Sequence, residues 1–107
     1  MSGFFIMYYL YILHSSLSDK YYVGSSSDPR RRLVEHNTSD FLIFTSKHCP
    51  WVLVATFEAG SSRSEAEALE RFIKRQKSRK LINRLVDSSF VPDGPLAQLV
   101  SVPHVRD

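Results

Sequence analysis

A chain of 107 residues has the size of one small domain, and it can bury only a modest hydrophobic core. Hydrophobic residues make up 43% and charged residues 23%, a balance that excludes global disorder and is ordinary for a soluble globular protein. Fourteen Lys and Arg against eleven Asp and Glu give a net charge of only +3. Two basic clusters, at 30–32 and 74–84, could neutralise phosphates, but such runs are also common on solvated helices.

The cysteine content and the N-terminus indicate the compartment. The single cysteine, Cys49, excludes an internal disulfide and is typical of a reducing cytoplasm. His48-Cys49-Pro50 has no second Cys/His pair at ligand spacing, so it predicts no thiolate metal site. The apolar stretch GFFIMYYLYIL has no basic segment before it and is well short of the ~20 residues that span a bilayer. We therefore expect a cytoplasmic protein without a membrane anchor, in which this stretch is a buried strand.

The first 36 residues predict a strand, a strand and a helix. Residues 4–13 are almost continuously apolar, which predicts a central strand, and residues 21–24 form the returning strand after a polar turn. Gly24 is expected where a side chain would block a backbone angle or a close approach. Asp28-Pro29 is a helix start, and the helix is expected to end at His36, with Asn37 as a left-handed terminator.

The middle and the end of the chain predict one more strand and two helices. Residues 41–44 could form a short strand, but a loop flanking the site, with Lys47 exposed, is the preferred interpretation. The segment WVLVATFE, residues 51–58, predicts a strand. Ser64 and Glu67 match a capping box that starts a helix, Ser78 marks a break, and residues 79–86 predict a second short helix. Residues 87–107 hold three of the five prolines and predict a mobile or loosely docked tail after a domain of residues 1–86.

An ordered set of motifs resembles the GIY-YIG nuclease family. Tyr9-Leu10-Tyr11 and Tyr22-Val23-Gly24 resemble its two tyrosine motifs, with Tyr9-Leu10 where the family has Gly-Ile. The interval of eleven residues between Tyr11 and Tyr22 fits the family, as do an Arg and a His ten and fourteen residues after Tyr22. The resemblance continues through ALERFIKRQKSRKLINRL and covers roughly residues 7–86. It implies a small α/β (α+β) domain, with a three-stranded, mostly antiparallel sheet flanked by helices.

The resemblance also implies a set of site residues. It assigns catalytic roles to six side chains and the metal to the glutamate among them: Tyr11, Tyr22, Arg32, His36, Glu70 and Asn83. A tyrosine with its ordinary pKa of about 10 must be shifted or assisted by a cation to activate water at neutral pH. An arginine can hold phosphate oxygens in a fork, and Mg²⁺ often takes one protein carboxylate plus water and phosphate. Further contacts to DNA are expected from Arg30, Arg31, Lys47 and Lys74.

Each of these residues also has an ordinary structural interpretation. Tyr11 and Tyr22 could be sheet aromatics, and Arg32 a solvated helix charge. His36 could be a favourable charge at a helix end, and Asn83 a helix cap. Glu70 could form an i, i+4 salt bridge with Lys74, worth a few tenths of a kcal/mol. The Arg-x-x-x-His spacing after the tyrosine strand favours the functional interpretation.

The expected function is that of a metal-dependent DNA endonuclease. Water would be activated by Tyr11 together with Tyr22 or His36, and would attack a phosphorus atom held by Arg32 and by Mg²⁺ or Mn²⁺ on Glu70. Family precedent implies products with 5′-phosphate and 3′-hydroxyl ends. Selectivity for single strands or for DNA structure, and a role in DNA repair, are compatible with so short a chain, which we expect to be a monomer, with a dimer left open. Two alternatives remain, a catalytically silent nucleic-acid-binding module and an adaptor protein without DNA affinity.

Overall fold

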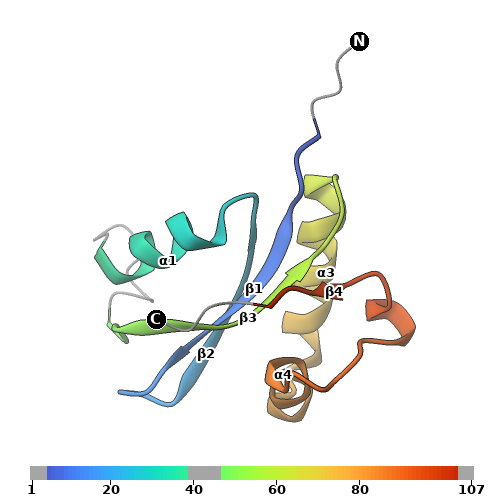
Figure 1. Ribbon diagram of the computed structural model, residues 1–107. Helices are drawn as coiled ribbons and strands as arrows, with labels where there is room; N and C mark the ends of the chain where they lie inside the picture. The colour runs from blue at the N-terminus through green and yellow to red at the C-terminus, as the bar shows by residue number, and fades with distance from the viewer. Residues whose placement is uncertain (1–4, 39–46, 104–107) are drawn as a thin grey trace.

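The computed structural model describes residues 5–38 and 47–103. In these residues four antiparallel strands form one sheet in the order β2-β1-β3-β4 (Figure 1). The strands are β1 (Tyr9–Ser15), β2 (Lys20–Ser26), β3 (Trp51–Glu58) and β4 (Val100–Ser101). The helices are α1 (Pro29–Thr38), α3 (Arg63–Gln76) and α4 (Arg79–Val86), with a short 3₁₀ helix, η1 (Gly94–Leu96).

The α+β class with an antiparallel sheet is confirmed, but the predicted number of three strands is wrong. β4 is the additional strand, and it pairs with the end of β3 at Phe57↔Ser101 and Glu58↔Val100. A two-residue strand has no period that a sequence pattern could reveal, and this one lies in the proline-rich segment after Asp87. Leu96 and Leu99, from the same segment, are buried in the core. The division of the chain at residue 86 stays a prediction.

The helices lie on opposite faces of the sheet, with α1 on one side and α3 and α4 on the other (Figure 1). The larger core forms under α3 and α4 around Leu10, Ile12, Phe57, Leu69 and Ile73. A smaller cluster on the α1 face holds four buried side chains: Tyr11, Leu13, Trp51 and Leu53. β1 lies between β2 and β3, so its side chains supply both layers, as the unbroken apolar sequence predicted.

The boundaries of the first two strands differ from the prediction. β1 begins at Tyr9 rather than near Phe4, because the apolar run of the sequence starts before the residues that pair with β2 and β3. β2 extends through Gly24 to Ser26, because Ser25 and Ser26 pair with Leu10 and Tyr9 across the hairpin. The third strand occupies residues 51–58, as predicted.

Helix ends follow local capping chemistry. Asp28 caps α1, since its Oδ1 accepts a hydrogen bond from the amide of Arg31 at 3.2 Å. α1 continues past His36, and the Asn37 side chain bonds both backbone groups of Trp51, which ties the helix end to the start of β3. The cap of α3 is Ser62 rather than Ser64, since the Ser62 hydroxyl accepts from the amide of Glu65. Ser78 separates α3 from α4 as predicted and caps α4.

The prediction for residues 41–44 lies outside the described residues. Among the helices that the structure describes, none combines the length and the apolar composition needed to cross a lipid bilayer.

Candidate active site

The site begins with the contact between Tyr11 on β1 and Gly24 on β2. These residues face each other in the β1–β2 register, and the Tyr11 ring lies across the β2 backbone. A Cβ atom added to Gly24 would lie 2.5 Å from the Tyr11 hydroxyl oxygen. The glycine therefore permits a close approach, one of the two roles expected for it, and directs the tyrosine toward the outer edge of β2.

The Tyr11 hydroxyl is hydrogen-bonded to His36. Its oxygen lies 3.2 Å from His36 Nε2, and the two side chains are 1% and 0% exposed. His36 sits in the last turns of α1, the helix that covers this face of the sheet, so the helix and the strand together fix the pair. The buried Nδ1 atom of His36 has no hydrogen-bond partner among the described residues.

Burial shifts both groups toward their neutral forms. It raises the pKa of Tyr11 to about 12, although a hydrogen bond from Arg32 acts in the opposite direction. Burial also lowers the pKa of His36 to about 4, and the positive charge of Arg32 acts in the same direction. At neutral pH the pair is therefore a phenol beside an uncharged imidazole. Glu70 contributes to the raised pKa of Tyr11 through its negative charge.

Arg32 is the cation that acts on both members of this pair. Its guanidinium donates a hydrogen bond to Glu35, one turn along α1, and its side chain is 28% exposed. Arg32 is thus held in place while part of it stays open to solvent. This combination suits a group that binds an anion arriving from outside. The contact between Glu35 and Arg32 depends on the side-chain conformations in α1, so the sequence alone did not indicate it.

Tyr22 and Lys74 connect the buried pair to Glu70. The Tyr22 ring centroid lies 4.5 Å from that of His36 and 6.4 Å from that of Tyr11. The Lys74 ammonium lies 5.2 Å from the centre of the Tyr22 ring and donates a hydrogen bond of 2.6 Å to Glu70 Oε2. The salt bridge that the alternative interpretation of Glu70 requires is therefore present.

Ser25 contacts Glu70, and no sequence motif predicted this contact. Its hydroxyl donates a hydrogen bond of 2.7 Å to Glu70 Oε1, so both carboxylate oxygens are engaged. Ser25 lies next to Gly24 on β2, and it faces α3 because side chains alternate along a strand. The predicted strand ended at residue 24, so the orientation of Ser25 was not predicted, whereas β2 extends to Ser26.

Asn83 lies apart from the other five candidates. It is exposed on α4, and its Oδ1 accepts a hydrogen bond of 3.5 Å from the hydroxyl of Tyr21. Tyr21 packs against the core under α3 and α4, while Tyr22 packs on the α1 face. The described contacts thus join Tyr11, Tyr22, Arg32 and His36 directly, Glu70 through Lys74, and Asn83 to none of them.

The residues expected to contact DNA lie on several surfaces. Arg30, Arg31 and Lys47 are exposed, as predicted for Lys47. Arg31 lies 3.3 Å from Glu35 and is thus partly neutralised on its own helix. Lys74, whose side chain is 44% exposed, adjoins the Tyr22 ring.

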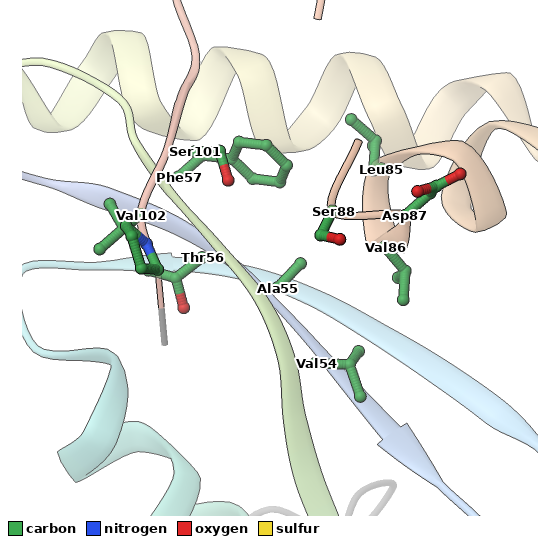
Figure 2. A pocket seen from close by; sticks show the side chains of 11 residues that line it. Val54, Ala55, Thr56, Phe57, Leu85, Val86, Asp87, Ser88, Ser101 and Val102 are labelled. Atoms are coloured by element: carbon green, nitrogen blue, oxygen red, sulfur yellow. The ribbon is translucent and has the colours of Figure 1, made fainter. Parts of the chain in front are cut away.

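A separate cavity of about 530 Å³ lies between β3, the end of α4 and the segment around β4 (Figure 2). Among the described residues that line it, Asp87 alone is charged, and Thr56, Phe57 and Val102 belong to its wall. The cavity shares no described lining residue with the Tyr11 cluster, and the charge of Asp87 would repel phosphate. It is therefore not the candidate active site.

The donor set limits the metal that the site could hold. Among the described residues, no three His, Cys, Asp or Glu side chains lie close enough together to form a metal site of their own. Glu70, whose side chain is 19% exposed, is a carboxylate that Lys74 links to the tyrosine cluster and that Ser25 orients. A hard cation such as Mg²⁺ fits this arrangement, because it keeps several water ligands and needs only one or two protein carboxylates.

Comparisons with known proteins agree with the arrangement of motifs. Residues 7–83 match the sequence model of the family described as the GIY-YIG catalytic domain. A protein of Streptococcus pneumoniae serotype 4, named UPF0213 protein, is 33% identical over 69 residues, which are 64% of this chain and 68% of that protein. A UPF0213 protein of Halobacterium salinarum is 36% identical over 69 residues, 64% of this chain and 87% of that protein. The region matched by the family model contains every candidate site residue.

Proposed function

Because this chain belongs to the GIY-YIG family, we propose that it is an endonuclease that hydrolyses phosphodiester bonds in DNA with the help of one divalent metal ion. The buried hydrogen bond between Tyr11 and His36, beside Arg32, is the observation that carries the proposal. The neutral imidazole holds the phenol in a fixed orientation, and the cation next to them suits a charged phosphate. A purely structural tyrosine would need none of these neighbours.

The two shifted pKa values limit how protons can move. Moving the proton from Tyr11, with a pKa of about 12, to His36, with a pKa of about 4, is strongly unfavourable in the free protein. His36 therefore orients the phenol through its Nε2 atom. Tyr11 can act as a base for water only after nearby positive charge has lowered its pKa enough for the phenol proton to leave to solvent. Arg32 already lowers the pKa of Tyr11.

Glu70 is the residue that would hold the metal ion. Its negative charge now raises the pKa of Tyr11, so neutralising this carboxylate with a cation would lower that pKa. When bound there, Mg²⁺ or Mn²⁺ would supply positive charge for the phosphate oxygens. A cation held by Glu70 would compete with the Lys74 ammonium for this carboxylate, which Ser25 also contacts. Arg32, which is hydrogen-bonded to Tyr11, would hold the phosphate next to the tyrosine.

The proposal is tested by cleavage of labelled single-stranded and duplex DNA with Mg²⁺, with Mn²⁺ and with EDTA. We expect metal-dependent cutting that is lost in Glu70→Ala and Glu70→Gln. Glu67→Gln, which changes a carboxylate one turn earlier on α3, is the matched control and should cut like the wild type. Cutting that persists in EDTA or in Glu70→Gln would refute the metal role of Glu70. The same substrates show which strand state is preferred.

The Glu70–Lys74 salt bridge favours a second function, that of a catalytically silent nucleic-acid-binding module. In that case the lysine occupies the carboxylate permanently, and the basic and aromatic groups only bind the strand. Wild-type protein that binds both DNA substrates but cuts neither would favour this second function. Protein that neither binds nor cuts would favour an adaptor.

A further inference from the structure

A basic groove of about 370 Å³ lies between the β1–β2 turn and the junction of α3 and α4. Four cationic side chains line it, Lys20, Lys74, Lys77 and Arg79, together with the carboxylate of Asp19. Tyr21 and two isoleucines from α3 and α4 form its apolar lining. Lys74 also contacts Glu70 and the ring of Tyr22, so the groove begins where the candidate active site ends.

The negative charge of Asp19 in the groove is already neutralised. Asp19 Oδ1 lies 2.8 Å from an Arg79 guanidinium nitrogen and 2.9 Å from His14 Nε2. Arg79 also donates a hydrogen bond of 3.0 Å to the backbone carbonyl of Asp19 and lies 4.9 Å from the centre of the Tyr21 ring. Arg79 therefore joins the hairpin to α4 and cancels Asp19. The remaining positive charge comes from Lys20 and Lys77, together with Lys74, which is paired with Glu70 at the start of the groove.

These lysines are placed differently from ordinary surface charges. Lys20 and Lys77 are exposed, and within residues 5–38 and 47–103 neither forms an ion pair. Lys77 has φ 48°, and its amide bonds the carbonyl of Lys74, so the turn after α3 fixes the backbone that carries it. Three ammonium groups thus line one groove around an aromatic side chain. Such a row of cations can follow the phosphate backbone of a single strand of nucleic acid.

We propose that this groove binds one strand of nucleic acid leading away from the active site, with its phosphates contacted by Lys20, Lys74 and Lys77. The inference rests on the proposed function of the neighbouring site and adds the path of its substrate. It also assigns phosphate contacts to Lys20 and Lys77, which the motif set leaves without a role. Because the contacts are to phosphate, DNA and RNA strands should both be bound.

The test is fluorescence anisotropy with a labelled single-stranded DNA, the same sequence as RNA, and a duplex, in EDTA so that no metal-dependent cutting occurs. The double variant Lys20→Gln/Lys77→Gln is compared with Arg71→Gln, which removes an exposed cation of α3 outside the groove. Removing two phosphate-binding cations should weaken single-strand binding about 25-fold at about 0.1 M salt and reduce the slope of log K against log salt by about 1.4. All substituted residues are exposed, and an unchanged melting temperature would confirm that the variants are folded.

The groove and the proposed activity can fail separately. The groove is refuted if the double variant binds single strands like the wild type, if Arg71→Gln loses as much affinity, or if only duplex binding falls. Wild-type cleavage with unchanged variant affinity would thus refute the groove alone. Loss of single-strand affinity in the variant, with no cutting by the wild type, would support the groove and refute the nuclease. Wild-type protein that binds no strand refutes the groove, whatever the cleavage assay gives.

Discussion

The interior and the rim of the candidate site use different physics. Tyr11 and His36 are almost completely buried, and burial moves both of their pKa values away from neutrality. Glu70 and Lys74 lie at the rim, with side chains 19% and 44% exposed, and their charges pair across one turn of α3. Desolvation thus sets the pKa values in the interior. At the rim, the Glu70–Lys74 pair can open so that Glu70 binds a metal ion or Lys74 binds a phosphate. Substitutions should separate the two regions.

The largest effect is expected from Tyr11→Phe, which alters the interior alone. Removing the hydroxyl should lower the cleavage rate by roughly 10²- to 10⁴-fold, the range for a missing proton-transfer group. It should cost about 1–3 kcal/mol of unfolding free energy, since His36 Nε2 is left without its buried partner. Binding to DNA in EDTA should not change, because the rim keeps its charges. Single-turnover cleavage, urea unfolding and anisotropy measure the three quantities.

Tyr9→Phe is the matched control for this substitution. Tyr9 lies two residues earlier on β1, on the same face, and is only partly buried. It should cut and unfold like the wild type. Equal losses of rate in the two variants would mean that the hydroxyl of Tyr11 has no special part in the reaction.

The fold and part of this site could be predicted from the sequence, because local patterns specify them. The tyrosine strands, the Asp28-Pro29 helix start and the 51–58 strand each carry their own periodic or capping pattern. The Arg-x-x-x-His spacing places Arg32 and His36 one turn apart on α1, and both adjoin Tyr11 in the structure. The contact between Ser25 and Glu70 spans 45 residues, so no local pattern could indicate it. The β4 strand was missed for the same reason, since only its pairing with β3 defines it.

The second largest effect is expected on stability in acid, and it should arise from the buried His36. The unfolded chain protonates His36 near pH 6.5, whereas the folded protein keeps it neutral down to about pH 4. The unfolded state therefore binds more protons in this window, and stability is full above pH 6.5 and falls as the pH drops to 4. The loss should approach roughly 3 kcal/mol. Urea unfolding at pH 7.5, 6, 5 and 4.5 measures it.

His36→Gln should flatten this acid limb, although it also lowers stability at neutral pH by removing the bond to Tyr11. His14→Gln is the comparison, because the His14 side chain is 27% exposed and contacts Asp19 rather than the Tyr11 pair. This variant should retain most of the wild-type slope of stability against pH. An acid limb in His36→Gln as steep as that of the wild type would assign the loss of stability to other groups.

The smallest effect is expected from Lys74→Gln, which alters the rim and leaves the interior intact. The i, i+4 pair with Glu70 is half-exposed, so the free energy of unfolding should change by only a few tenths of a kcal/mol. The acid limb set by His36 should keep its slope. Affinity for a single strand in EDTA should fall about fivefold at about 0.1 M salt, the effect of removing one phosphate-binding cation. Lys74→Arg keeps the charge and should restore most of that affinity. If Lys74→Gln instead destabilised the protein by several kcal/mol, the rim would belong to the same cooperative unit as the buried pair. The division between a buried pair that sets proton chemistry and rim charges that can bind ions would then be wrong.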